Sequence, residues 1–128
     1  MTLTGAEQDI AANLWSLTNE GGPGSFLVVS SGEVYIQFAG NVGNQRLRCE
    51  AISNQYLSDK LQLSPQAVDK LKALGFALSG DPIETYSRTY ELPTDDYAAG
   101  LAQLTLRILT EVYGVAPDAE IEIDLSLE

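Results

Sequence analysis

Apolar residues recur at helical spacing in three parts of the chain, and two of these have the pattern of ordinary amphipathic helices. The first covers residues 3–17, where the apolar stripe consists of Leu3, Ala6, Ile10, Leu14 and Leu17. The second covers residues 64–75. Ser64 is a suitable N-cap, Pro65 occupies the first helical position, and Gly75 accommodates the left-handed conformation that ends many helices. We therefore expect two helices, of which the second has sharply defined ends.

The third helical segment follows Thr94, a suitable N-cap, and ends at Gly114. Asp95 and Asp96 fall in its first turn, where carboxylates interact favourably with the helix dipole. Its apolar stripe is unusually wide and includes Tyr97, Ala98, Leu101, Leu104, Ile108, Leu109 and Val112. Two explanations are open: the helix contacts a second surface, such as another copy of the protein, or it lies deep against a sheet.

Alternation of apolar and polar residues predicts β-strands in five further segments. Residues 25–30, 33–39 and 46–52 are separated by short turns rich in Gly and Asn, so we expect a three-stranded antiparallel meander. Residues 83–92 predict a fourth strand. Residues 118–128 alternate Ile and Leu with acids, which predicts a strand with one apolar and one acidic face. The pattern does not decide whether this strand belongs to the same sheet or forms an arm for a partner.

These elements predict an α+β fold in a single domain of residues 1–128, in which a helix, a meander, a helix, further strand and a long C-terminal helix follow one another. No apolar run approaches the ~20 residues that cross a bilayer. The first residues lack the basic and apolar regions of a secretion signal. Cys49 is the only cysteine, which excludes an intramolecular disulfide and fits a reducing compartment. We therefore expect a cytoplasmic protein.

The charge distribution restricts the choice of partners. The net charge is −11, and residues 81–128 contain eleven acidic against two basic residues. Nucleic-acid binding depends on many Lys and Arg contacts to phosphate, and anionic membranes attract basic segments. The chain has seven basic residues in all. We expect no nucleic-acid partner and no membrane partner, whereas a basic or apolar polypeptide remains compatible.

Candidate catalytic and metal-binding groups are few. The chain has no His, which removes the usual general base, the Ser-His and Cys-His pairs and the commonest metal ligand. We expect no catalytic residue, metal or cofactor, and therefore no enzyme. Arg48 and Glu50 lie on one phase of a predicted strand and form the best remaining polar cluster, either as an exposed ion pair or as part of a site. An enzyme that uses Glu50, Asp95 and Asp96 is a third, weaker hypothesis.

Four stretches, in order, carry a resemblance to a known family: VYIQFAG, RLRCEAISNQYL, LSPQAVDKLKALGF and LTLRILTEVYGV. Together they resemble the YbjN-like and type III secretion chaperone-like (TY-Chap) domains of bacteria. The corresponding positions are Tyr35 and Gln37, Glu50 through Leu57, Leu74-Gly75-Phe76, and Val112-Tyr113-Gly114. Phe76 stands where the family commonly has Trp. The resemblance covers about residues 26–115 and leaves out the first helix and the acidic tail at 116–128.

The resemblance implies the fold of secretion chaperones, which agrees with the order predicted from periodicity. It also implies a small, acidic, often homodimeric protein that holds a client polypeptide without chemistry. Ser53, Asn54 and Gln55 separate the third strand from Tyr56 and Leu57. We expect these three polar residues to end the strand by bonding neighbouring backbone groups, with direct ligand contact as the alternative.

The first functional hypothesis is a non-enzymatic, chaperone-like domain, a homodimer that binds an extended client peptide on an open sheet face or edge. Its predicted contacts share one phase of the first two strands, opposite to that of Phe26, Val28, Val34, Ile36 and Phe38, and they are Leu27, Val29, Tyr35 and Gln37. Charges at Val29 and Tyr35 together are expected to abolish binding in a protein that still folds. The alternative is a small-ligand or regulatory domain, with a pocket between sheet and helix polarised by Arg48, Glu50 and Arg88.

Overall fold

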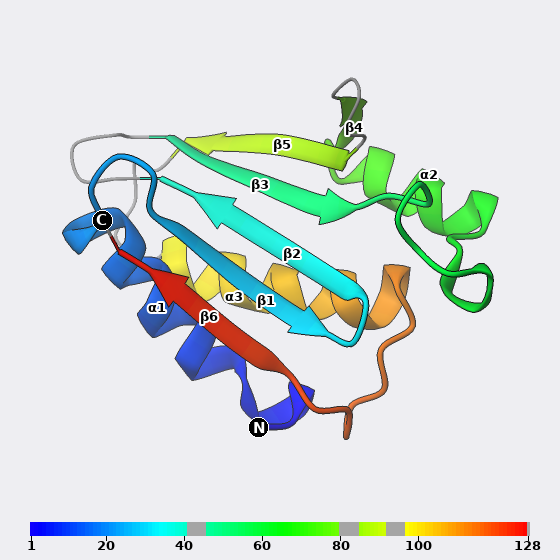
Figure 1. The fold of residues 1–128 in the computed structure, drawn as a ribbon, viewed down its shortest axis with the longest axis horizontal. Coiled ribbons are helices and arrows are strands. Elements are labelled where there is room, and N and C mark those ends of the chain that lie inside the picture. The colour runs from blue at the N-terminus through cyan, green and yellow to red at the C-terminus, as the bar shows by residue number, and fades with distance from the viewer. Residues whose placement is uncertain (41–45, 80–84, 92–96, 128) are drawn as a thin grey trace.

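The computed structural model describes residues 1–40, 46–79, 85–91 and 97–127, which form a sheet with helices packed on one face (Figure 1). The α-helices are α1 (Glu7–Glu20), α2 (Pro65–Ala73) and α3 (Tyr97–Arg107). The strands are β1 (Phe26–Ser31), β2 (Val34–Ala39), β3 (Arg46–Ile52), β4 (Ala77–Ser79), β5 (Thr85–Glu91) and β6 (Glu122–Ser126). The predicted α+β fold is confirmed. The expected turn at 41–45 and the expected roles of Thr94, Asp95 and Asp96 lie outside the described residues.

The six strands that the structure describes form one antiparallel sheet in the order β4-β5-β3-β2-β1-β6. The predicted meander β1-β2-β3 lies at its centre. Ser31 pairs with Val34, so the first hairpin has a two-residue turn. Gly32 occupies the first turn position with φ +60°, a conformation that favours glycine and matches the twist of the hairpin.

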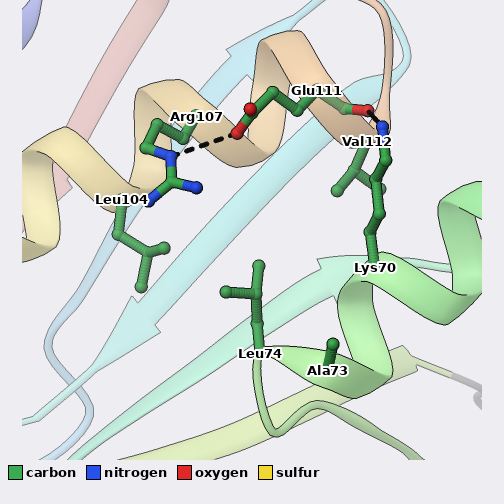
Figure 2. Close-up of a pocket in the computed structure, with 7 residues that line it drawn as sticks. All are labelled: Lys70, Ala73, Leu74, Leu104, Arg107, Glu111 and Val112. Carbon is green, nitrogen blue, oxygen red and sulfur yellow. Dashed lines mark hydrogen bonds and ion pairs between the residues drawn. The ribbon is translucent and has the colours of Figure 1, made fainter.

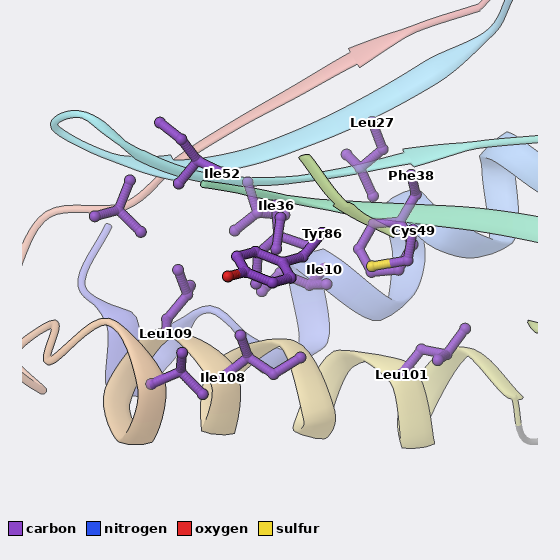
Figure 3. Packing of buried hydrophobic residues seen from close by; sticks show 14 of the residues in the cluster. Ile10, Leu27, Ile36, Phe38, Cys49, Ile52, Tyr86, Leu101, Ile108 and Leu109 are labelled. Atoms are coloured by element: carbon purple, nitrogen blue, oxygen red, sulfur yellow. The ribbon is translucent and has the colours of Figure 1, made fainter. Parts of the chain in front are cut away.

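One face of the sheet is covered and forms the core. In Figure 1, α1 and α3 lie behind the sheet. The strand residues that face them alternate along each strand, as a half-covered sheet requires. The fully or almost fully buried ones from β1, β2, β3 and β5 are Leu27, Val29, Val34, Ile36, Phe38, Leu47, Cys49, Ala51 and Tyr86. Figure 3 shows several of these side chains facing Leu101, Ile108 and Leu109 of the C-terminal helical segment.

Local signals in the sequence define the ends of α2 closely. The Ser64 hydroxyl oxygen accepts a hydrogen bond from the Ala67 N–H at 3.1 Å, and Pro65 opens the helix. Gly75 has φ +92°, and the following Phe76 N–H donates to the Leu71 carbonyl. The predicted helix is therefore confirmed together with its caps. Helix α1 begins later than expected, since residues Leu3–Gly5 form a 3₁₀ turn ahead of it.

The wide apolar stripe of the C-terminal helix is explained within one copy of the chain. Helix α3 continues as a π-helical segment, Ile108–Val112, in which the Tyr113 N–H donates to the Ile108 carbonyl five residues earlier. This continuous helix lies beside α1 as well as against the sheet (Figure 1). Tyr97, for example, lies within hydrogen-bonding reach of Thr18 on α1. The stripe therefore contacts the sheet and also a second surface, which is α1 of the same chain, so each of the two explanations accounts for part of it.

The alternating tail forms strand β6, which pairs with β1 in the same sheet. Ile123 and Leu125 face the helix side and are half-buried, whereas Glu122 and Asp124 are exposed. Ahead of the strand, Glu120 forms an isolated antiparallel bridge with Thr2. Within the described ranges, no helix is long and apolar enough to cross a membrane.

Candidate functional site

The front face of the sheet in Figure 1 is open, since none of the described helices crosses it. Register places on this face the strand residues that alternate with the core. In the central strands these are Phe26, Val28, Ser30, Tyr35, Gln37, Ala39, Arg46, Arg48 and Glu50. All of them are partly or fully exposed. The open face therefore offers aromatic, apolar and charged groups on a rigid surface.

Four of the seven residues predicted as contacts come together on this face: Tyr35, Gln37, Arg48 and Glu50. Gln37 pairs with Glu50 across the β2-β3 ladder. Arg48 Nε lies 2.9 Å from Glu50 Oε1, and the two side chains are 56% and 30% exposed. Partial burial raises the pKa of the Tyr35 hydroxyl, and the nearby Glu50 carboxylate raises it further. The predicted Arg48–Glu50 ion pair is thus present, at a place where such pairs add little to stability.

Leu27 and Val29 do not share a face with Tyr35 and Gln37, so the predicted grouping is wrong. Leu27 pairs with Phe38 and Val29 pairs with Ile36, and residues paired across a ladder point to the same side. Both side chains are 0% exposed. A charge at Val29 would therefore enter the core, and the doubly charged variant proposed from the sequence is expected not to fold.

Arg88 also lies on the opposite face from Arg48 and Glu50, because it pairs with Cys49. Its guanidinium lies 4.4 Å from the centre of the Tyr90 ring and donates a hydrogen bond to the Leu74 carbonyl at the end of α2. Burial raises the pKa of Tyr90 to about 12. The structure therefore places Arg88 where it holds the end of α2 on the sheet, and the predicted pocket polarised by all three residues is not formed.

Cys49 is a core residue. The side chain is 2% exposed, and burial together with the Glu50 charge raises the pKa of its thiol. A thiol with a raised pKa stays protonated and is a poor nucleophile. In the part of the chain that the structure describes, no group of three His, Cys, Asp or Glu side chains is arranged to hold a metal ion.

The outer edge of β6 is a feature that the sequence analysis did not assign to the site. The Ile121 N–H donates to the Met1 carbonyl at 2.8 Å, so it points away from β1. Successive backbone groups of a strand point to alternate sides, which turns the N–H and C=O of Ile123 and Leu125 outward as well. These groups have no hydrogen-bond partner among the described residues. They form an unpaired strand edge of the kind that accepts another strand.

The surroundings of this edge differ on its two sides. On the helix side, a groove with a volume of ≈ 300 Å³ is lined by Met1, Asp9, Asn13, Ile121 and Ile123. On the open side, Glu120, Glu122 and Asp124 are exposed at alternate positions. A strand added to β6 would thus place one set of side chains beside acids and the other set beside an apolar groove with an acidic rim.

Asn54 fixes the loop that follows β3. Its Oδ1 accepts a hydrogen bond from the Leu63 N–H at 2.6 Å, and its Nδ2 donates to the Leu63 carbonyl at 3.3 Å. The Gln62 amide donates to the backbone carbonyls of Asn54 and Leu57, both at 2.7 Å. These contacts support the structural role expected for this stretch, because each one joins loop to loop.

Replacing Asn54 by Ala is expected to lower the free energy of unfolding by about 2 kcal/mol, because two hydrogen bonds to the backbone of the buried Leu63 are lost. Asn54→Asp keeps the acceptor but not the donor, and we expect about half of that loss. Urea unfolding measures both values. Equal stability of all three proteins, with altered peptide binding in Asn54→Ala, would assign the residue to the binding site instead.

Comparison with protein families gives a match that covers most of the chain. The family model described as TY-Chap3, "T3SS (YopN, CesT) and YbjN peptide-binding chaperone 3", matches residues 7–126. The match includes α1 and β6, which lay outside the resemblance seen in the sequence. No curated protein and no solved structure gives a significant match.

Proposed function

Because the chain belongs to the TY-Chap3 family of peptide-binding chaperones, we propose that it holds a client polypeptide by adding an extended client segment to the outer edge of β6. The protein would act by binding alone, without catalysis. The unpaired backbone groups of Ile123 and Leu125 carry the proposal. Main-chain hydrogen bonds to such an edge supply affinity for many sequences, which suits a chaperone.

The side chains around the edge favour a particular client chemistry. Client residues that point to the open face would lie beside Glu122 and Asp124, where Lys or Arg is favoured by charge. Client residues that point to the helix side would lie beside Ile121 and Ile123 in the groove. We therefore propose an extended segment that alternates basic and apolar residues. The net charge of −11 supports this choice, because it attracts basic segments at long range.

Fluorescence anisotropy with a labelled peptide of about eight alternating Val and Lys residues tests the proposal. We expect saturable binding to the wild-type protein. Two N-methylated versions serve as matched controls, since each removes the N–H groups on one edge of the peptide and leaves the side chains unchanged. The version that loses the N–H groups facing β6 is expected to bind at least tenfold more weakly, while the other retains its affinity.

Equal affinity of the two N-methylated peptides would contradict strand addition, because side-chain contacts alone would then explain binding. A peptide of alternating Val and Glu provides the charge control and is expected to bind at least tenfold more weakly than the Val-Lys peptide. If the acidic peptide binds as well as the basic one, the proposed client chemistry is wrong while strand addition stands.

We also propose that the chaperone acts in the cytoplasm, which is supported by its single, buried Cys49.

The homodimer expected from the resemblance stays a prediction. The side chain of Trp15 on α1 is 52% exposed. It is a large apolar group that a second copy of the chain would cover in a homodimer. Sedimentation equilibrium of the purified protein measures the oligomeric state directly.

A further inference from the structure

A second groove lies on the helical layer, between α2 and the C-terminal part of α3 (Figure 2). Its volume is ≈ 280 Å³, and its apolar lining comes from Ala73, Leu74, Leu104 and Val112. In Figure 1 this region is on the side of the molecule away from β6. The groove is therefore separate from the strand edge proposed above.

Basic groups from both walls flank the groove in a protein that has few of them. Lys70 comes from α2 and Arg107 from α3, and Glu111 stands between them. Arg107 Nε lies 3.1 Å from Glu111 Oε2, whereas Lys70 Nζ donates to the Glu111 backbone carbonyl at 3.3 Å. Lys70 has no carboxylate partner within the described ranges. The three side chains leave the groove with one net positive charge, against −11 for the whole chain.

The Glu111 carboxylate marks where an external carboxylate would bind. The side chains of Arg107 and Glu111 are 65% and 54% exposed, and an ion pair this exposed contributes little free energy. An incoming carboxylate can therefore replace Glu111 at Arg107 and also use the remaining N–H donors of Lys70. The ligand for this groove carries an acidic group next to an apolar one.

The shape of the groove indicates that the acidic and apolar groups of its ligand belong to a polypeptide helix. Sites for small molecules enclose most of their ligand, but here Lys70, Ala73, Arg107 and Glu111 are all exposed, so the groove is open to solvent. Both walls are helices, and two helices side by side form the receptor surface for a third, amphipathic helix. The volume suits one or two aliphatic side chains.

We propose that the groove between α2 and α3 binds an acidic amphipathic helix of a partner polypeptide, with Leu-type side chains against Leu74 and Leu104 and an Asp or Glu at Lys70 and Arg107. The groove thus selects the opposite charge from the β6 edge. One molecule would hold a basic extended segment and an acidic helical segment at separate places.

The test uses a labelled helical peptide of about 14 residues built from Leu, Ala and Glu, with the Leu residues on one face. Its control, the Lys twin, is the same peptide with Lys in place of every Glu. Anisotropy is measured at about 0.15 M salt, where the Debye length of ≈ 8 Å screens the distant negative charges of the protein. We expect the Glu peptide to bind at least tenfold more tightly than its twin. Arg107→Glu and Ala73→Trp, both at exposed positions, are expected to weaken its binding at least tenfold.

Glu111→Gln distinguishes a binding role from a structural one. Removing the internal carboxylate frees Arg107, so we expect this variant to bind the Glu peptide about threefold more tightly than wild type. Ile123→Pro is expected to leave this binding unchanged, which separates the result from that of the β6 edge. Circular dichroism shows that each variant is folded.

The proposal is overturned if the Glu peptide binds no more tightly than its Lys twin, or if Glu111→Gln weakens binding. It is also overturned if the groove is covered by a second copy of the chain. In that case sedimentation would show a dimer of the wild-type protein that Ala73→Trp converts to a monomer.

Discussion

Val29→Asn is expected to lower the free energy of unfolding by about 4 kcal/mol, whereas Val28→Asn on the same strand lowers it by about 1 kcal/mol. Val29 is 0% exposed and pairs with Ile36 on the covered face. An amide there loses its hydrogen bonds to water and also the apolar burial of the valine. Val28 pairs with Gln37 on the open face and is half-buried, so its amide replacement stays hydrated.

The two variants form a matched pair, because residue type, substitution and strand are the same and only the face differs. Chemical denaturation followed by circular dichroism measures both. Since a domain of this size is stable by only ~5–15 kcal/mol, Val29→Asn is expected to unfold at a clearly lower denaturant concentration. Similar losses for the two variants would mean that the first strand is covered on both faces or is paired in another register.

Ile123→Pro is expected to weaken binding of the alternating Val-Lys peptide at least tenfold in a protein that remains folded. The Ile123 N–H points away from β1, so proline removes a donor that the sheet does not use, and proline is tolerated on edge strands. It also blocks the approach of another strand to this edge. Peptide anisotropy and thermal unfolding are measured on the same sample.

Asp124→Pro provides the control, one residue further along the chain. Its N–H points toward β1, where Asp124 pairs with Val28, and its loss removes a hydrogen bond of the ladder. We expect this variant to be the less stable of the two by about 2 kcal/mol or more. If Ile123→Pro binds the peptide as wild type does, the client does not add to β6, and the open face around Tyr35 becomes the better candidate.

The order and type of the elements were predictable because their signals are local. The cap at Ser64, the proline at its first helical position and the glycine that ends α2 determine that helix within one short segment. Strand β4, only three residues long, lacks such a signal, and the sequence does not distinguish it from the loop around it. Local patterns also could not show that the tail pairs with β1, although its alternation predicted a strand.

The faces of the first two strands were assigned incorrectly, although the hairpin contains the information. A two-residue turn pairs odd-numbered residues of one strand with even-numbered residues of the next. Leu27 and Val29 must therefore share a face with even-numbered residues of β2. Tyr35 and Gln37 therefore belong to the other face. Contacts between distant parts of the chain determine which face the helices cover and which strand lies at the edge of the sheet. The residue pattern within one strand carries no information about these contacts.

The pairing of β1 with β6 has a consequence for how the protein is made. Phe26 and Ser126 are 100 positions apart in the sequence yet are neighbours in the sheet. During synthesis the meander can form long before residues 122–126 leave the ribosome. Until then β1 itself is the outer strand, with the backbone groups of Phe26, Val28 and Ser30 unpaired and without the acids of β6 beside them. Before β6 is made, the meander would thus leave the outer edge of β1 exposed, and β6 is the segment that covers this edge in the folded protein.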